Sequence, residues 1–301
     1  MNYTEAIQTE GLSKDYGQGH GLFELDLTVH RGEICGFLGP NGAGKSTTMR
    51  LLLDLISPTS GSAQLMDLDA HDGSLEVRRR VGFLPGDFAL YPKLTGTAVL
   101  DYLARVRGGV DRHVRDQLAE RFAAQLDRPL HQLSTGNRQK VGLIQAFMHE
   151  PELLILDEPI AGLDPLVQQS FHALLTEVAS QGRTVFLSSH TLSEVERVAD
   201  RVAILRRGRL VAMDTLESLR AVAVRRLEIE FGGAGPAAAQ LQALPGVREA
   251  VVHDSHMVVA FEGSADALVK AIAPYEVRSI RSQDDELESI FLQYYRDGEE
   301  S

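Results

Sequence analysis

The sequence has no tryptophan, a single cysteine and no long apolar run, and the last two shortages exclude whole classes of protein. With Cys35 alone, no disulfide can form within the chain, which fits a reducing compartment. In the apolar run ICGFLG we interpret Cys35 as a small buried core residue. No run approaches the about 20 apolar residues that span a bilayer. The N-terminus MNYTEAIQTEG also lacks the basic start and apolar stretch of a secretory signal. We therefore expect a cytoplasmic protein.

Basic residues are also scarce, since 30 Lys and Arg stand against 42 Asp and Glu and the net charge is −12. Nucleic-acid-binding proteins carry a basic footprint, so we expect no nucleic acid partner. Anionic lipid head groups would repel an acidic surface. Any attachment to a membrane should therefore go through a protein partner.

The apolar patterning indicates an α/β fold in the first part of the chain. Residues 22–29 alternate apolar and polar side chains, as a half-buried strand does. Three nearly continuous apolar runs are typical of strands buried on both faces of a parallel sheet; they cover 33–38, 152–157 and 184–189. We expect helices to begin near Lys45, Gly136 and Pro165. This arrangement predicts a mostly parallel sheet with helices against it.

Two further regions differ from this α/β pattern. The short apolar strand VGFL covers 81–84. Between about 86 and 150 the spacing is helical and predicts an inserted helical subdomain. After residue 220 the pattern predicts a small α+β domain with the ferredoxin-like order β-α-β-β-α-β. Its expected elements are strand 225–231, helix 236–244, strands 247–253 and 256–261 with a turn at Asp254-Ser255, helix 265–273, strand 275–281 and a final helix 285–295. We therefore predict two domains, 1–220 and 221–301, which a chain of 301 residues can accommodate.

A glycine-rich run, GPNGAGKS, matches the phosphate-loop pattern G-x-x-x-x-G-K-[ST] and stands between an expected strand and an expected helix. Glycines let the backbone wrap closely around phosphate oxygens, and the amide groups then face the anion. Lys45 should reach the β- and γ-phosphates, and the Ser46 hydroxyl should bind Mg²⁺. The candidate ATP-binding residues of this loop are Gly39, Pro40, Asn41, Gly42, Ala43, Gly44, Lys45, Ser46 and Thr47.

A second apolar run ends in two carboxylates, LLILDE over 153–158. Asp157 ends a buried strand, where a carboxylate is costly unless it serves a cation, so we expect it to hold Mg²⁺ through water. Glu158 follows at the mouth of the strand and is placed to polarise an attacking water molecule. Together with the glycine-rich loop, these residues indicate a P-loop NTPase.

Further motifs narrow this class. LSTGNRQK (133–140) resembles the LSGGQ signature of ABC proteins, and Tyr16 in SKDYG, GLDP (162–165) and His190 in FLSSH follow in the order of that family. Over about residues 5–220 the chain therefore resembles an ABC ATP-binding cassette. The resemblance implies that Tyr16 stacks on adenine, that His190 contacts the γ-phosphate and that Asp164 lies in a loop at the dimer interface.

The same resemblance implies that the signature contacts the ATP held by an opposite subunit, so that two cassettes enclose two ATP molecules. The residues concerned are Ser134, Thr135, Gly136 and Asn137, of which Thr135 and Asn137 replace a glycine and a glutamine of the family pattern. Ser134 and the Gly136 amide would form an anion site at the start of a helix.

The chain departs from the family at two other places. Gly86 stands where the family has a glutamine that reaches Mg²⁺ and the membrane domain, and Ile160 replaces a common threonine. Glycine has no ligand atom, but it gives the loop freedom to move Asp87 inward. Asp87 is therefore a candidate for contact with Mg²⁺ or its water shell, with the permease interface or solvent as equal alternatives.

The resemblance implies the ATPase subunit of an ABC transporter, an exporter with a separate membrane permease, acting as a homodimer or with a related cassette on the inner face of the membrane. Rival functions are a soluble ABC ATPase acting on DNA or ribosomes, a small-molecule kinase and a regulatory binding module. Only 112 positions separate Lys45 from Asp157, which leaves no room for the long coiled coil of chromosome-type members. A kinase would not need the signature, and the intact Glu158 argues against a purely regulatory role.

Overall fold

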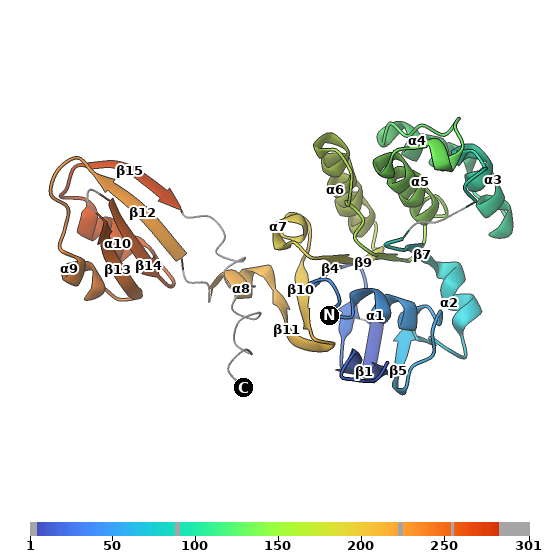
Figure 1. The fold of residues 1–301 in the computed structure, drawn as a ribbon, viewed down its shortest axis with the longest axis horizontal. Helices are drawn as coiled ribbons and strands as arrows, with labels where there is room; N and C mark the ends of the chain where they lie inside the picture. The colour runs from blue at the N-terminus through green and yellow to red at the C-terminus, as the bar shows by residue number, and fades with distance from the viewer. Residues whose placement is uncertain (1–4, 88–90, 222–224, 254–255, 283–301) are drawn as a thin grey trace. The chain divides into compact units, whose positions relative to one another are not determined.

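A computed structural model describes residues 5–87, 91–221, 225–253 and 256–282. The chain forms two compact units, Met1–Met213 and Asp214–Ser301. Figure 1 shows the elements of each unit.

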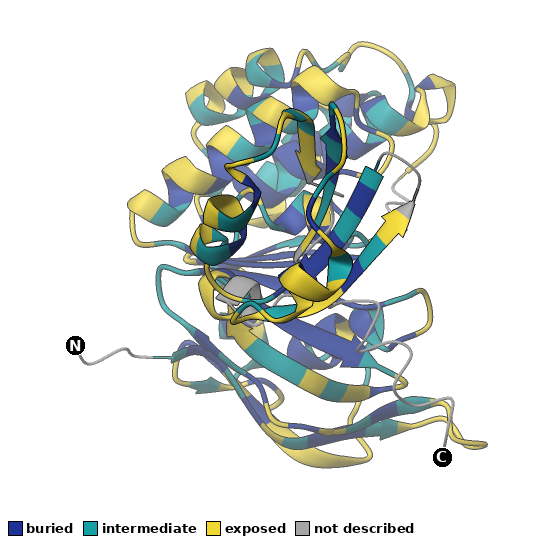
Figure 2. Cartoon of the chain, turned by 90° about the vertical axis from the view of Figure 1, so that its left-hand side faces the viewer, coloured by how far each residue is buried: buried dark blue, intermediate teal, exposed yellow. Residues whose placement is uncertain are grey.

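The centre of the first unit is a six-stranded sheet with the order β11-β10-β4-β9-β8-β7. Its strands are β4 (Ile34–Leu38), β7 (Val81–Leu84), β8 (Leu153–Leu156), β9 (Thr184–Ser189), β10 (Arg201–Arg206) and β11 (Arg209–Thr215). From β10 to β7 all neighbours are parallel, and β4, β8 and β9 are buried at every residue (Figure 2). The predicted α/β core with a mostly parallel sheet is confirmed.

A second sheet contains three strands that the sequence does not predict, over residues 5–15, 60–65 and 68–69. It comprises β1 (Glu5–Asp15), β2 (Gly21–Leu25), β3 (Thr28–His30), β5 (Ser60–Leu65) and β6 (Leu68–Asp69). The single strand predicted over 22–29 is wrong, because the chain breaks at Asp26. There the Thr9 hydroxyl donates to the Leu25 carbonyl and accepts from the Leu27 amide, and the Asp26 carboxylate accepts from the Gly11 amide. These bonds let β2 and β3 pair with different parts of β1.

Helix α1 (Lys45–Leu52) joins the two sheets through one hydrophobic core. Met49 and Leu52 on its buried face belong to the same cluster as Leu65 of β5 and Phe37 of β4. Because α1 starts directly behind the glycine-rich loop, this packing fixes the loop against the end of β4. Helix α2 (Ser74–Arg80) leads into β7.

Helices follow β7 and precede β8: α3 (Gly96–Val106), α4 (Arg112–Arg121), a short 3₁₀ turn (Leu130–Gln132) and α5 (Thr135–Phe147). Helix α5 packs against α3 and α4 (Figure 1). Helix α4 ends before the run of helical spacing does. Ala123 adopts a left-handed φ of 47°, and the Asn137 side chain accepts from the Gln125 amide and donates to the Gln125 carbonyl. Helix α6 (Pro165–Ser180) follows β8, and the short α7 (Leu192–Val195) follows β9.

The second unit begins with the end of β11 and α8 (Leu216–Ala221). It continues with β12 (Arg225–Phe231), α9 (Ala238–Gln242), β13 (Val247–His253), β14 (His256–Phe261), α10 (Asp266–Ile272) and β15 (Val277–Ser282). The strand order is β13-β14-β12-β15, and all pairs are antiparallel. Ile229 and Val259 of the sheet pack with Leu241 and Leu268 of the helices.

The turn predicted at Asp254-Ser255 and the final helix predicted over 285–295 lie outside the described residues. Among the residues described, no helix has the length and apolar character needed to cross a membrane.

Candidate active site

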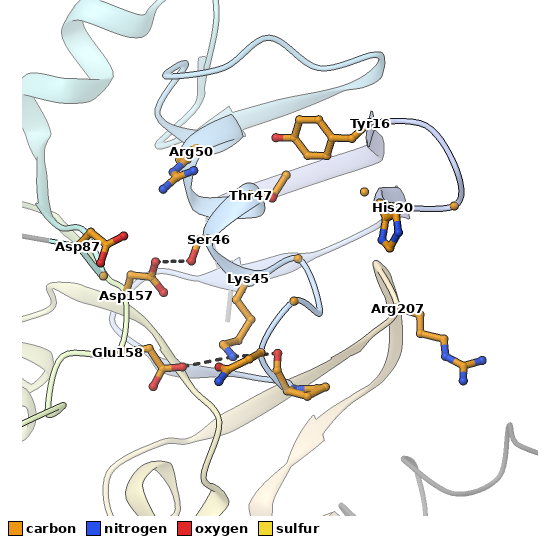
Figure 3. A pocket seen from close by; sticks show the side chains of 17 residues that line it. Tyr16, His20, Lys45, Ser46, Thr47, Arg50, Asp87, Asp157, Glu158 and Arg207 are labelled. Carbon is orange, nitrogen blue, oxygen red and sulfur yellow. Dashed lines mark hydrogen bonds and ion pairs between the residues drawn. The ribbon is translucent and has the colours of Figure 1, made fainter.

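A pocket of about 720 Å³ lies where β4, β7 and β8 end (Figure 3). Parallel strands bring their carboxyl ends to one edge of a sheet, and this edge therefore collects the loops that follow them. The residues that line the pocket are Tyr16, Gly19, His20, Gly21, Pro40, Asn41, Gly42, Gly44, Lys45, Ser46, Thr47, Arg50, Gly86, Asp87, Asp157, Glu158 and Arg207. Most of the predicted phosphate loop is thus present.

Gly39 and Ala43 of that loop are absent from the lining because they shape the loop from behind. A β-carbon on Gly39 would lie 2.6 Å from the Leu205 carbonyl oxygen, and Ala43 is buried. Gly42 and Gly44 have φ values of 81° and 111°, which residues with side chains rarely adopt. The structure therefore explains each glycine of the motif by a close approach or by a backbone angle.

Lys45 is buried beneath the loop, with its ammonium group facing three oxygen atoms. The ammonium group donates to the carbonyls of Gly39 and Pro40 and lies 3.2 Å from Glu158 Oε1. A buried cation requires such partners, because burial without them is costly. The arrangement holds a positive charge at the floor of a pocket whose walls include backbone amides.

Asp157 has both carboxylate oxygens engaged. The Ser46 hydroxyl donates to Oδ2 and the Ser188 hydroxyl donates to Oδ1, each at 2.6 Å. The oxygen donors of Ser46, Asp157 and Asp87 line one pocket and are the ligand type that Mg²⁺ prefers. In the part of the chain that the structure describes, no three His, Cys, Asp or Glu residues gather as a metal site. Phosphate and water oxygens would have to complete the shell of a bound metal.

Gly86 lies beside the Asp157 carboxylate and lines the pocket with Asp87, which Figure 3 shows. A β-carbon on Gly86 would approach Asp157 Oδ2 to 3.1 Å, a tight contact, so the missing side chain leaves space next to that carboxylate. Asp87 is exposed and lines both this pocket and a neighbouring groove. The geometry is therefore compatible with contact to Mg²⁺ or its water shell, with the permease interface and with solvent.

Glu158 stands between two nitrogen groups. Its Oε1 faces Lys45, and its Oε2 lies 2.9 Å from Nδ1 of His190, which follows β9 and is about half exposed. The Glu158 backbone has a left-handed φ of 48°, which is uncommon for a residue other than glycine. Glu158 follows β8 and His190 follows β9, and because these two strands are parallel neighbours both residues lie at one edge of the sheet.

The signature residues do not line the pocket of their own chain. Ser134 caps α5 by accepting from the Asn137 amide, and both Ser134 and Thr135 are exposed. Gly136 packs so closely on Gly162 that a β-carbon would lie 2.4 Å from its carbonyl oxygen. The Asn137 side chain is buried against Gln125, so the structure does not present it at the surface.

Asp164 in GLDP caps α6 by accepting from the Val167 amide. Its other carboxylate oxygen lies 3.7 Å from Lys140 Nζ on α5. The loop that contains Asp164 and the signature helix are therefore linked within one chain.

Sequence reasoning missed the residues around Tyr16, which is 57% exposed. His20, Arg50 and Arg207 line the same pocket. The glycine-rich run GQGHG behind Tyr16 could have indicated His20, but no local signal marks Arg207. The turn that contains Arg207 reaches the pocket because Gly208 packs closely on Gly21. A β-carbon on Gly208 would lie 2.2 Å from the Gly21 carbonyl oxygen.

Comparisons with known proteins agree with this geometry. The ABC transporter family model matches residues 22–161. The bacitracin transport ATP-binding protein BcrA of Enterococcus faecalis is 38% identical over 208 residues, 68% of each chain. The protein of the same name from Bacillus licheniformis is 32% identical over 293 residues, 95% of this chain and 96% of the relative. The chain belongs to the ATP-binding proteins of ABC transporters.

A solved structure described as the ATP-binding subunit of an ABC transporter is 32% identical and covers 71% of this chain and 92% of its own, with a TM-score of 0.66. This ABC protein is thus the ATP-binding and ATP-hydrolysing subunit of a transporter. The resemblance inferred from the motifs is confirmed.

Proposed function

We propose that the 720 Å³ pocket binds ATP, with adenine at Tyr16 and the phosphates on residues 39–47, and that Glu158 activates the attacking water. The position of the Glu158 carboxylate supports this role. It lies between the buried Lys45 cation and His190. A γ-phosphate bound on the loop would face it with the side that the attacking water approaches. His190 then holds the carboxylate and contacts the γ-phosphate.

Mg²⁺ belongs to the same proposal. Ser46 would bind it directly and Asp157 through water, as their 2.6 Å contact and their oxygen chemistry allow. When bound, the metal ion neutralises charge on the transferred phosphoryl group. Lys45 neutralises the same group from below the loop.

We further propose a cassette dimer, formed by two copies or with a related cassette. The support is the position of Ser134 and Thr135, which are exposed at the first turn of the 13-residue helix α5 and absent from their own pocket. Amide groups at a helix start attract phosphate. The ATP of a partner would meet this surface through Ser134 and the Gly136 amide, whereas the buried Asn137 side chain stabilises the loop behind it.

A separate membrane permease is the second proposed partner. A groove of about 290 Å³ beside Asp87 combines apolar and cationic residues and fits an apolar segment with an acidic or polar end. It is lined by Leu53, Leu55, Arg78, Val81, Phe83, Pro85, Asp87, Leu103, Arg107 and Gln145. This contact would hold the subunit on the cytoplasmic face of the membrane. Export is the direction we propose, as in the single-cassette exporters that the chain resembles.

Glu158→Gln tests the proposal, because it removes the negative charge and keeps the shape. ATP should still bind, and turnover should fall at least about a hundredfold. The variant should accumulate an ATP-bound dimer on size-exclusion chromatography. Glu177→Gln, an exposed change on α6, is the matched control. Unchanged turnover in Glu158→Gln would remove Glu158 from catalysis, and a monomer at saturating ATP would contradict the dimer.

A further inference from the structure

The strained backbone of Glu158 is held by two side chains to which the sequence motifs assign no role. The Glu158 amide donates to Ser188 Oγ at 3.0 Å. On the other side, Gln139 Nε2 donates to the Glu158 carbonyl at 3.2 Å and to the Pro159 carbonyl at 3.0 Å. The residue with the left-handed φ of 48° is therefore held by hydrogen bonds at both its amide and its carbonyl.

Both side chains are buried and lie outside the lining of the pocket. Ser188 on β9 is 0% exposed and Gln139 on α5 is 7% exposed, and neither lines the pocket. Buried amide and hydroxyl groups are normally hydrogen-bonded. Here their partners include backbone groups of the loop after β8 that contains Glu158 and Pro159, which we call the catalytic loop. Ser188 also donates to Asp157, so one hydroxyl positions both carboxylate residues.

We propose that Gln139 and Ser188 form a clamp that keeps the Glu158 carboxylate between Lys45 and His190. This inference rests on the proposed catalytic role of Glu158. A backbone in a sparsely populated region persists only where its surroundings hold it. Without the clamp, the peptide relaxes toward an ordinary φ, and the carboxylate moves away from the position from which water attacks the γ-phosphate. Gln139 and Ser188 are positioning residues, since neither reaches the pocket.

The clamp also ties Glu158 to the signature helix of its own chain. Gln139 lies one turn beyond Gly136 on α5, and Gly136 itself packs on Gly162 in the loop after Glu158. The start of α5 and the catalytic loop are thus in contact at two points. A displacement of α5 in the assembled transporter would therefore shift the Glu158 backbone.

Gln139→Met tests the clamp, because methionine has a similar length and no donor. We expect kcat to fall at least about tenfold, since a small misplacement of a catalytic group has effects of this order or larger. The Kd of ATP, measured by titration, should stay within about threefold, because phosphate contacts on the loop are untouched. Gln242→Met is the matched control, since Gln242 donates from a helix to the Ala250 carbonyl at 3.1 Å in the second unit.

Ser188 provides an independent test if Gln139→Met does not fold. Ser188→Ala should lower kcat, and Ser188→Thr, which keeps the hydroxyl, should restore it in part. Thermal unfolding and ATP titration measure the fraction of each variant that is folded and binds ATP. Each kcat is calculated per folded site, so a loss of activity that comes only from unfolding disappears.

Glu158→Gln separates the two levels of the argument. If Glu158→Gln is inactive while Gln139→Met and Ser188→Ala turn over like the wild type, the clamp is wrong and the proposed function stands. If Glu158→Gln itself hydrolyses ATP at the wild-type rate, both are overturned. A fall in ATP affinity equal to the fall in kcat would also contradict the clamp, because it would place the effect on binding.

Discussion

His149, at the end of the signature helix, should make the first unit sensitive to acid. Its Nε2 lies 3.2 Å from the Val81 carbonyl oxygen, to which Arg107 donates as well at 3.3 Å. Burial and the nearby Arg107 charge lower the pKa of His149 from 6.5 to about 4. Protonation of His149 would place a second positive charge beside Arg107 in a partly buried site.

The sign follows from proton linkage. The folded chain binds fewer protons than the unfolded chain between pH 6.5 and 4, so stability is complete above this window and is lost as the pH falls through it. At pH 5.0 a shift of this size costs about 2 kcal/mol relative to pH 7.5, and partial exposure of the ring reduces the figure to about 1 to 2 kcal/mol.

Urea unfolding of the first-unit transition at pH 7.5 and 5.0 measures this effect. His149→Gln keeps a side-chain donor but cannot titrate, so its loss of free energy of unfolding between the two values should be smaller than that of the wild type by about 1 to 2 kcal/mol.

His71→Gln is the control of opposite sign. The hydrogen bond to Asp54 at 2.8 Å raises the pKa of His71. This contribution is present below the unfolded pKa and is lost as the pH rises through the folded one. Removing His71 should therefore increase the acid sensitivity. Equal losses in the wild type and His149→Gln would refute the reasoning.

Four further predictions concern the site. Gly136→Ala should lower turnover at least about tenfold with ATP binding retained, because its β-carbon would lie 2.4 Å from the Gly162 carbonyl oxygen; full turnover would contradict this packing. Tyr16→Ala should raise the Kd of ATP at least about fivefold, as loss of base stacking does, while Tyr16→Phe should not. Asp87→Ala should raise the half-saturating Mg²⁺ concentration of the ATPase; an unchanged value with impaired transport would assign Asp87 to the groove. A chain ending at residue 220 should keep its ATP affinity in a nucleotide titration, since the pocket lies wholly before that residue.

Much of the active site was predictable because its chemistry lies in continuous segments. A loop that wraps phosphate must place its glycines and Lys45 a few residues apart, and such a pattern is legible without a fold. Asp157 and Glu158 were expected from the buried strand that they follow, and His190 from the family resemblance. The structure brings all three to one carboxyl edge because the strands are parallel. The strands themselves were visible as apolar runs, since both of their faces are covered.

Only the tertiary structure revealed which side chains hold these residues in place. Gln139 and Ser188 lie 19 and 30 positions from Glu158, on a helix and a strand, and nothing in their local sequence indicates which backbone groups they bind. Arg207 reaches the pocket through a turn, and the break at Asp26 depends on Thr9 and Gly11 of another strand. The physical reason is the same in each case. A motif records chemistry between neighbours in the chain, whereas a buried polar side chain finds its partner among groups that only folding brings near.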